Sequence, residues 1–283
     1  MSSPVAIVTG ASSGIGLAIT MHLLSRGFRV VMADVNAADG TRISAELGES
    51  TKFIQTNVAV YADQAVLFRE AFKWGGNRLD FLAANAGIDD RQSLYEEDSE
   101  ESEDGTPKEL SLLTLRVNLD AVFQGIWLFK HYVRKNAIPG GKIVITSSAA
   151  GFYPMSSNPQ YTASKHGLIG LTRAAGLHQP LISENITVNC ICPTFVHTNL
   201  CPPHIRDKFP QEHVTPMSTV LKAVDLFLDS SASGETVELS LGQLHYRKVP
   251  PYLDDNTRWL GQEAAKLWEE GYEQPPQLKE QAV

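Results

Sequence analysis

VAIVTGASSGIG, residues 5–16, is the stretch that decides the fold. Its first four residues form a short β-branched run, which is typical of a buried parallel strand and too short for a helix. A helical pattern follows the glycines and reaches Gly27, which can close a helix. Strand, glycine-rich turn and helix form the context that a dinucleotide-binding turn requires. The stretch therefore predicts an α/β fold with a nucleotide site at the end of its first strand.

The three glycines of this turn have separate expected roles. Gly10 permits the tight turn, Gly14 lets the backbone approach a pyrophosphate at the helix N-terminus, and Gly16 permits close helix–strand packing. Their spacing is Gly-x-x-x-Gly-x-Gly, and TGASSGIG resembles the cofactor turn of the short-chain dehydrogenase/reductase family. The resemblance implies cofactor contacts along the turn, at Gly10, Ser12, Ser13, Gly14, Ile15 and Gly16.

An acidic residue ends the second expected strand, residues 29–33. Asp34 lies about where a carboxylate accepts hydrogen bonds from the ribose hydroxyls of a dinucleotide. A carboxylate there repels the 2′-phosphate of NADP, and Val35 beside it, which is also an expected cofactor contact, supplies no arginine. NAD is therefore the expected cofactor and NADP the less favoured one. A solvated Asp34 without a ligand is the structural alternative.

Tyr161 and Lys165 stand four residues apart, one turn apart on the same face if the segment is helical. A nearby ammonium favours the phenolate and lowers the pKa of the tyrosine, which makes it a general acid/base. Such a pair is common by chance, but Ser148 lies thirteen residues before Tyr161, at the end of strand 143–146. That spacing resembles the family's Ser–Tyr–Lys triad and implies that Ser148 holds the substrate oxygen. Ser147 is the weaker candidate, because adjacent strand residues point to opposite faces.

Asn118 interrupts the apolar face of a long helix expected over residues 107–136. The resemblance implies that this amide bends the helix through water and completes a proton relay to Lys165. A partly exposed or capped asparagine is the alternative. The predicted catalytic residues are Asn118, Ser148, Tyr161 and Lys165, and the last two are also expected to contact the cofactor.

The resemblance places further cofactor contacts at the ends of later strands. They are Asn57, Val58, Asn85, Ala86, Gly87, Val196 and Thr198. Asn57 stands where the family commonly has aspartate, and Asn85 has an equally weighted structural role in tying neighbouring strands. Thr194 replaces the family's usual glycine, and His197 is expected to be a loop residue rather than an acid/base.

Composition narrows the classes of partner. The 283 residues carry a formal net charge of −8, which disfavours nucleic acid and anionic membranes. The three cysteines, Cys190, Cys192 and Cys201, fit a reducing compartment, and no ligand set for a metal stands near them. Without a signal peptide or a long apolar run, the expected location is cytoplasmic.

The chain is expected to form one domain, residues 1–283. Its fold class is a Rossmann-type, doubly wound α/β domain with a seven-stranded, mostly parallel sheet. An acidic insertion at about 89–107 contains the charged run 96–104, expected to be a tolerated surface loop rather than a partner-binding segment. A substrate lid is expected at about 194–216. The C-terminal extension, about 242–283, includes a helix near 257–271 that packs on a partner subunit or walls the pocket.

The expected function is NAD-dependent interconversion of a secondary alcohol and a ketone on a lipophilic small molecule. The downstream half more loosely resembles 15-hydroxyprostaglandin dehydrogenase-like and fungal secondary-metabolism members of the family. The family usually forms dimers or tetramers through its two long helices, here 112–136 and 161–177. Two alternatives are an NADPH-dependent ketone reductase on the same fold and a non-redox, cofactor-bound scaffold or regulator.

Overall fold

The structure is a computed structural model that describes residues 3–95, 104–264 and 266–268. Its internal contacts divide the chain into two compact units, Met1–Arg247 and Lys248–Val283. The first unit carries every residue that the sequence predicts for the site. In the second, the helix α10, Asp255–Gln262, begins with a capping box in which the Asp254 side chain accepts a hydrogen bond from Thr257 N. The expected helix near 257–271 thus begins two residues earlier, and its last residues lie outside the described part.

One eight-stranded sheet organises the first unit, with the order β3-β2-β1-β4-β5-β6-β7-β8. Its strands are β1 Val5–Thr9, β2 Arg29–Asp34, β3 Thr51–Gln55, β4 Phe81–Ala84, β5 Gly141–Thr146, β6 Ile186–Pro193, β7 Thr236–Ser240 and β8 Gln243–Tyr246. All pairs are parallel except β7 with β8. This order confirms the predicted Rossmann-type, doubly wound fold.

The predicted number of seven strands is wrong by one. Ser240 and Gln243 pair across a two-residue hairpin, and Leu241 enters the turn at φ 51°, a left-handed value uncommon for leucine. The sequence shows no Asn-Gly or Asp-Gly signal there, so the sequence pattern did not predict β8. Because β8 joins the sheet, the part outside the first unit begins at Lys248 rather than at about 242.

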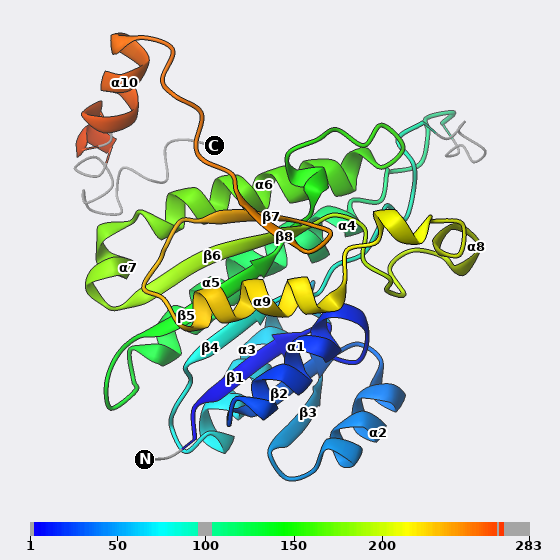
Figure 1. The fold of residues 1–283 in the computed structure, drawn as a ribbon, viewed down its shortest axis with the longest axis vertical. Helices are drawn as coiled ribbons and strands as arrows, with labels where there is room; N and C mark the ends of the chain where they lie inside the picture. The colour runs from blue at the N-terminus through cyan, green and yellow to red at the C-terminus, as the bar shows by residue number, and fades with distance from the viewer. Residues whose placement is uncertain (1–2, 96–103, 265, 269–283) are drawn as a thin grey trace. The chain divides into compact units, whose positions relative to one another are not determined.

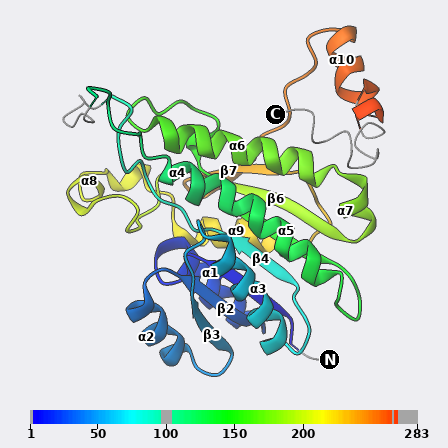
Figure 2. The same ribbon diagram turned by 180° about the vertical axis from the view of Figure 1, so that it is seen from behind.

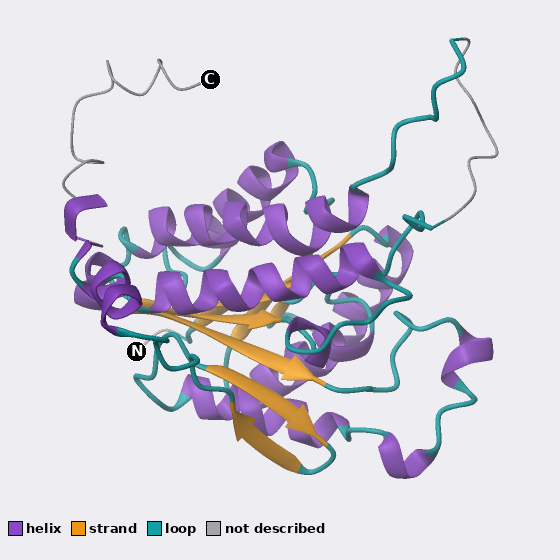
Figure 3. Ribbon diagram, turned by 90° about the horizontal axis from the view of Figure 1, so that it is seen from above, coloured by secondary structure: helices purple, strands orange, loops and turns teal. Residues whose placement is uncertain are grey.

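Helices cover both faces of the sheet, which lies between two helical layers (Figure 3). The helices α1, α2 and α9 pack on one face, and α3, α5 and α6 on the other, as opposite views show (Figures 1 and 2). Their bounds are α1 Gly14–Ser25, α2 Ala37–Leu47, α3 Tyr61–Trp74, α4 Leu113–Leu115, α5 Ala121–Val133, α6 Pro159–Gly176, α7 Gln179–Ser183, α8 Pro203–Arg206 and α9 Met217–Leu228. None of the helices in the described residues is long and apolar enough to span a bilayer.

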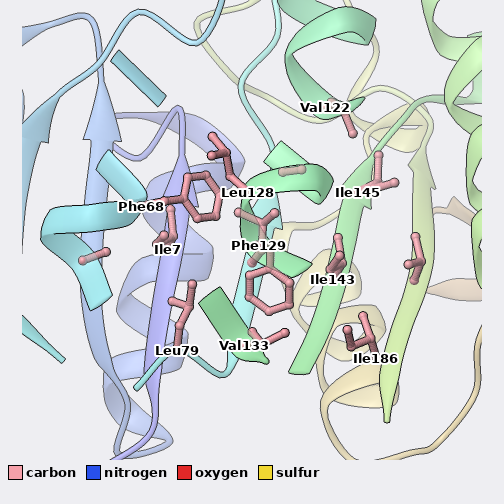
Figure 4. Close-up of a cluster of buried hydrophobic side chains, with 14 of the residues drawn as sticks. Ile7, Phe68, Leu79, Val122, Leu128, Phe129, Val133, Ile143, Ile145 and Ile186 are labelled. Atoms are coloured by element: carbon pink, nitrogen blue, oxygen red, sulfur yellow. The ribbon is translucent and has the colours of Figure 1, made fainter. Parts of the chain in front are cut away.

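One hydrophobic core lies between the sheet and the helices α3, α5 and α6, the last of which carries Tyr161 and Lys165. Figure 4 shows Phe68 and Phe129 among aliphatic side chains of β1 and β5, including Ile7 and Ile143. All four side chains are fully buried. Burying a side chain of this size stabilises the fold by about 1.5–3 kcal/mol relative to exposure. This packing fixes the carboxyl ends of the strands against the helices that meet there.

The long helix expected over 107–136 is three pieces. Helical structure starts at Leu113, passes through a π-helical turn at Arg116–Asp120, and continues as α5 to Val133. It starts late because Ser111 N donates to Gln92 Oε1 instead of to a helical carbonyl. It ends early because the Asn136 side chain bridges the backbone N–H and C=O of Leu79.

Two expected surface segments have different outcomes. Between β4 and α4 the described residues contain no strand of the sheet and no helix, and the acidic run lies outside them except for Asp104. Residues 194–216 form a loop that carries α8 and a short 3₁₀ turn, Gln211–His213. The ends of that loop are joined, since Thr215 N donates to Phe195 O at 2.8 Å and the Thr194 and Thr215 hydroxyls lie 2.6 Å apart.

Candidate active site

The predicted site residues gather at the carboxyl ends of the central strands. The glycine turn follows β1, Asn85-Ala86-Gly87 follows β4, and Ser148 follows β5 by two residues. The loop after β6 closes over the turn, because a Cβ placed on Gly14 would lie 3.1 Å from the Thr198 Cβ. In doubly wound sheets this edge is where ligands bind.

The glycine turn fits the pyrophosphate of a dinucleotide. Gly10 and Gly14 have φ values of 66° and 52°, which glycine adopts without strain. A Cβ on Gly16 would lie 2.1 Å from Gly10 O, so α1 can begin against β1 only with glycine there. Ser12 is buried, and its hydroxyl has no hydrogen-bond partner among the described residues. A buried orphan hydroxyl beside bare backbone at a helix N-terminus suits an anionic oxygen.

Asp34 joins the turn to the end of β2. Its carboxylate accepts hydrogen bonds from Ser12 N at 2.9 Å and from Asn36 N at 3.0 Å. Val35 next to it is exposed. The carboxylate is therefore fixed in orientation beside the glycine turn, where the sequence placed it.

Thr9 ties the residues after β4 to β1. Its hydroxyl accepts hydrogen bonds from Asn85 N and Ala86 N, both at 3.0 Å, while the Asn85 side chain donates to Thr9 O. The structural role expected of Asn85 is thereby confirmed. The sequence pattern did not single out Thr9, although its place directly before Gly10 was the available signal.

Tyr161 and Lys165 lie in the first turns of α6. Lys165 is buried, its Nζ donates to Thr146 O at 2.9 Å, and the same nitrogen lies 5.3 Å from the centre of the Tyr161 ring. Ser147 turns away, since its hydroxyl donates to Lys165 O. Ser148 Oγ instead lies near the Tyr161 phenol, and it accepts a hydrogen bond from Ala150 N. The choice of Ser148 over Ser147 therefore agrees with the geometry.

Asn118 occupies the π-helical turn and is fully buried. Its Oδ1 accepts a hydrogen bond from Ile88 N at 2.8 Å, and its Nδ2 donates to Ile88 O and to Ser164 Oγ. A Cβ on Gly87 would lie 3.4 Å from Asn118 Oδ1 and 3.5 Å from Lys165 Nζ. The amide thus faces the lysine across a residue that has no side chain.

Comparison with known proteins now gives the family. The family model described as short chain dehydrogenase matches residues 4–208. The chain belongs to the short-chain dehydrogenase/reductase family. It is 33% identical over 261 residues to short-chain dehydrogenase/reductase prx6 of Penicillium rubens, covering 87% of this chain and 86% of that one. It is 38% identical over 204 residues to 15-hydroxyprostaglandin dehydrogenase [NAD(+)] of Rattus norvegicus, covering 70% of each chain.

A solved structure shares the fold. The 3-ketoacyl-(acyl-carrier-protein) reductase from Brucella melitensis, complexed with NADH, superposes with a TM-score of 0.70 at 22% identity. The match covers 84% of this chain and 97% of the reductase. Family membership makes this short-chain dehydrogenase/reductase an NAD(P)-dependent oxidoreductase that acts on CH–OH groups.

The phenol of this family member is not activated as the sequence predicted. Burial raises the pKa of Tyr161, the hydrogen bond with Ser148 opposes that rise, and the Asp89 carboxylate adds to it. Burial also lowers the pKa of Lys165 from 10.5 to about 8. The phenol therefore has a raised pKa where the sequence predicted a lowered one, because desolvation outweighs the hydrogen bond with Ser148.

The remaining predicted cofactor residues have mixed placements. The Asn57 side chain accepts a hydrogen bond from Ala59 N, and Val58 O accepts one from Gln64 Nε2. Val196 is buried in the core on the α1 and α9 face. Thr198 and Val58 lie nearest the expected edge, the first against Gly14 and the second lining a small cavity with Thr9 and Ala86.

Two neighbouring residues of the site were missed by pattern reasoning. Asp89 accepts a hydrogen bond from Asn158 Nδ2 at 2.6 Å, and Asp90 accepts one from Tyr161 N at 2.6 Å. Both follow Asn85-Ala86-Gly87 within three residues, and this adjacency was the available signal. The sequence pattern assigned both residues to the acidic insertion, although they lie against the start of α6.

Proposed function

We propose that this protein catalyses NAD-dependent interconversion of a secondary alcohol and a ketone. One observation carries the proposal: the Tyr161 phenol lies beside the Ser148 hydroxyl and the buried Lys165, at the sheet edge that holds the glycine turn. A panel of secondary alcohols and ketones with NAD and NADP tests it. Turnover supports the proposal, and NAD binding without any turnover across the panel would favour the non-redox alternative.

The residues supply proton handling and orientation. A bound nicotinamide supplies the hydride acceptor. Ser148 Oγ donates a hydrogen bond to the alcohol oxygen, while Tyr161 Oη accepts the alcohol proton as the carbon is oxidised. Lys165 stabilises, by its charge, the phenolate that Tyr161 must form before it can accept this proton. Asn118 accepts a hydrogen bond from Ile88 N and donates one to Ser164 Oγ. These bonds fix the position of the segment that faces Lys165.

The acid/base is expected to respond to the nearby Asp89. The Asp89→Asn variant should lower the apparent pKa of Tyr161, because removing a like charge makes the phenolate easier to form. Alcohol oxidation needs the deprotonated phenol, so the rising limb of the pH–rate profile should move to lower pH. The asparagine keeps an oxygen for Asn158. Asp255→Asn, at an exposed residue of the second unit, is the control, and an unmoved profile in Asp89→Asn would contradict the prediction.

NAD is proposed as the cofactor over NADP. Support comes from the Asp34 carboxylate, held by Ser12 N and Asn36 N beside the turn, and from the NAD-linked names of relatives. A phosphate brought next to this carboxylate would be repelled.

Cofactor preference should change when that charge changes. The double variant Asp34→Ser, Val35→Arg should raise the ratio of kcat/KM for NADP to that for NAD by at least about a hundredfold, since it removes a repulsion and adds a guanidinium for phosphate. Val35→Arg alone separates the two contributions. If the wild type already prefers NADPH, the alternative of a ketone reductase is correct.

A lipophilic substrate is proposed because the loop 194–216, which follows β6 at the sheet edge of the site, and the segment after Ser148 both expose apolar side chains. Phe195 and Phe209 stack at 3.6 Å within the loop 194–216, and Ile205 of that loop is exposed. Tyr153 and Met155, which follow Ser148, are also exposed. We infer that this loop acts as the substrate lid and that the substrate is an apolar alcohol or ketone.

A homodimer or homotetramer is proposed for the assembly. Phe123 and Trp127 are exposed on α5, with exposed fractions of 51% and 58%, although large aromatic side chains usually find partners. Sedimentation analysis measures the assembly, and a monomer at micromolar concentration would contradict this proposal.

The cytoplasm is proposed as the location of the protein, supported by three cysteines that form no disulfide.

A further inference from the structure

The first turn of the catalytic helix lacks a cap of its own. Asn158 occupies the N-cap position, yet its side chain makes no capping bond, and Pro159 has no N–H to satisfy. Thr162 N donates to Asn158 O inside the helix. Two amides of the turn remain, those of Gln160 and Tyr161, and such donors need partners from outside the helix.

One carboxylate supplies both partners. Asp90 Oδ1 accepts the hydrogen bond from Tyr161 N at 2.6 Å, and Oδ2 accepts that from Gln160 N at 3.1 Å. Hydrogen bonds to an ionised carboxylate are about twice as strong as neutral ones. A negative charge at a helix N-terminus also interacts favourably with the helix dipole.

Asp90 itself is held by a well-anchored segment, residues 88–92. Asn118 bonds to both backbone groups of Ile88, and the Thr114 hydroxyl donates to Asp89 O. At the other end Gln160 Nε2 donates to Gln92 O. The segment therefore connects the π-helical turn to α6, and Asp90 lies at its middle.

We propose that Asp90 is a positioning residue for the acid/base, holding the first turn of α6 so that the Tyr161 phenol stays beside Ser148. The inference rests on the proposed function, because it assigns Tyr161 as the proton acceptor. Asp90 acts through the backbone of Tyr161. The glycine turn and Asp34 lie on other elements, so loss of Asp90 should affect NAD affinity far less than kcat.

Asp90→Ala should lower kcat by about a hundredfold, since small displacements of a reacting group cost about that much. The dissociation constant for NAD should change far less than kcat. Asp90→Asn keeps one acceptor oxygen for Tyr161 N and should recover most of the lost kcat. Asp254→Ala is the matched control, because Asp254 caps α10 through Thr257 N in the second unit and should leave kcat as in the wild type.

Amide hydrogen exchange of the peptide covering residues 159–165 gives a readout that needs no turnover. Asp90→Ala should exchange faster there, while Asp254→Ala should not. Full kcat in Asp90→Ala, or a loss of NAD affinity as large as the loss of kcat, would overturn the proposal. If the wild type turns over no substrate and Asp90→Ala still exchanges faster over residues 159–165, the cap is supported and the proposed function is refuted. The two failures are therefore distinguishable.

Discussion

Tyr161→Phe is expected to abolish measurable alcohol oxidation while leaving NAD binding nearly intact. The substitution removes only the hydroxyl that lies beside Ser148, and it keeps the ring that packs near Lys165. General acid/base catalysis contributes about 10²–10⁴-fold to a rate, so kcat should fall by at least that factor. The phenol makes no contact with the glycine turn that would alter cofactor affinity.

Steady-state kinetics and a direct titration of NAD measure the two effects separately. Tyr246→Phe is a matched control, because Tyr246 is half exposed and pairs with Val237 near the amino end of β7, at the opposite edge of the sheet from the site. Normal turnover in Tyr161→Phe would refute the proposed acid/base. A joint loss of turnover and NAD binding would indicate damage to the site as a whole instead of a missing proton acceptor.

Lys165→Met is expected to lose turnover and yet to raise the free energy of unfolding at pH 7. Burial lowers the pKa of Lys165 from 10.5 to about 8, and a shift of that size corresponds to about 3 kcal/mol against the charged form. Methionine has a similar length and no charge. It leaves Thr146 O without its partner, which costs about 1–3 kcal/mol. The net gain should therefore be at most about 2 kcal/mol.

The sign of this effect can be followed with pH. The folded lysine has the lower pKa, so between about 8 and 10.5 the unfolded chain binds more protons and the stability of the wild type rises with pH. The advantage of Lys165→Met should therefore be complete below pH 8 and should shrink above it, until near pH 10.5 only the cost of the unpaired Thr146 O remains. Urea unfolding at both ends of that window measures it. Lys222→Met, at an exposed residue of α9, is the control, and a less stable Lys165→Met at pH 7 would contradict the prediction.

Most of the fold follows from local patterns. The β-branched runs of β1 and β2, the glycine turn and the Ser148–Tyr161–Lys165 spacing each depend on residues close together in the chain. Such spacings are set by strand and helix periods, which the sequence states directly. The doubly wound, mostly parallel sheet was expected from the family resemblance, because successive β-α-β units wind in one hand.

Other features depend on pairings and contacts that the residue types along the chain do not signal. The strand β8 forms although Leu241 must enter a left-handed turn, because Val237 and Leu239 of β7 give it a partner. The π-helical turn arises where Asn118 bonds to Ile88, thirty residues earlier in the chain. Neither the β7–β8 pairing nor the hydrogen bond between Asn118 and Ile88 is signalled by the residue types. The expected count of seven strands and the expected unbroken helix were therefore wrong.

The sequence by itself determined the family, the doubly wound fold and the residue types of the site. Only the tertiary structure decided how those residues are charged and held. The pKa of Tyr161 rises because burial removes water from the phenol, and its helix is capped by Asp90, seventy-one residues away in the chain. Desolvation and charge sum over everything packed around a group, and no spacing along a chain contains that sum.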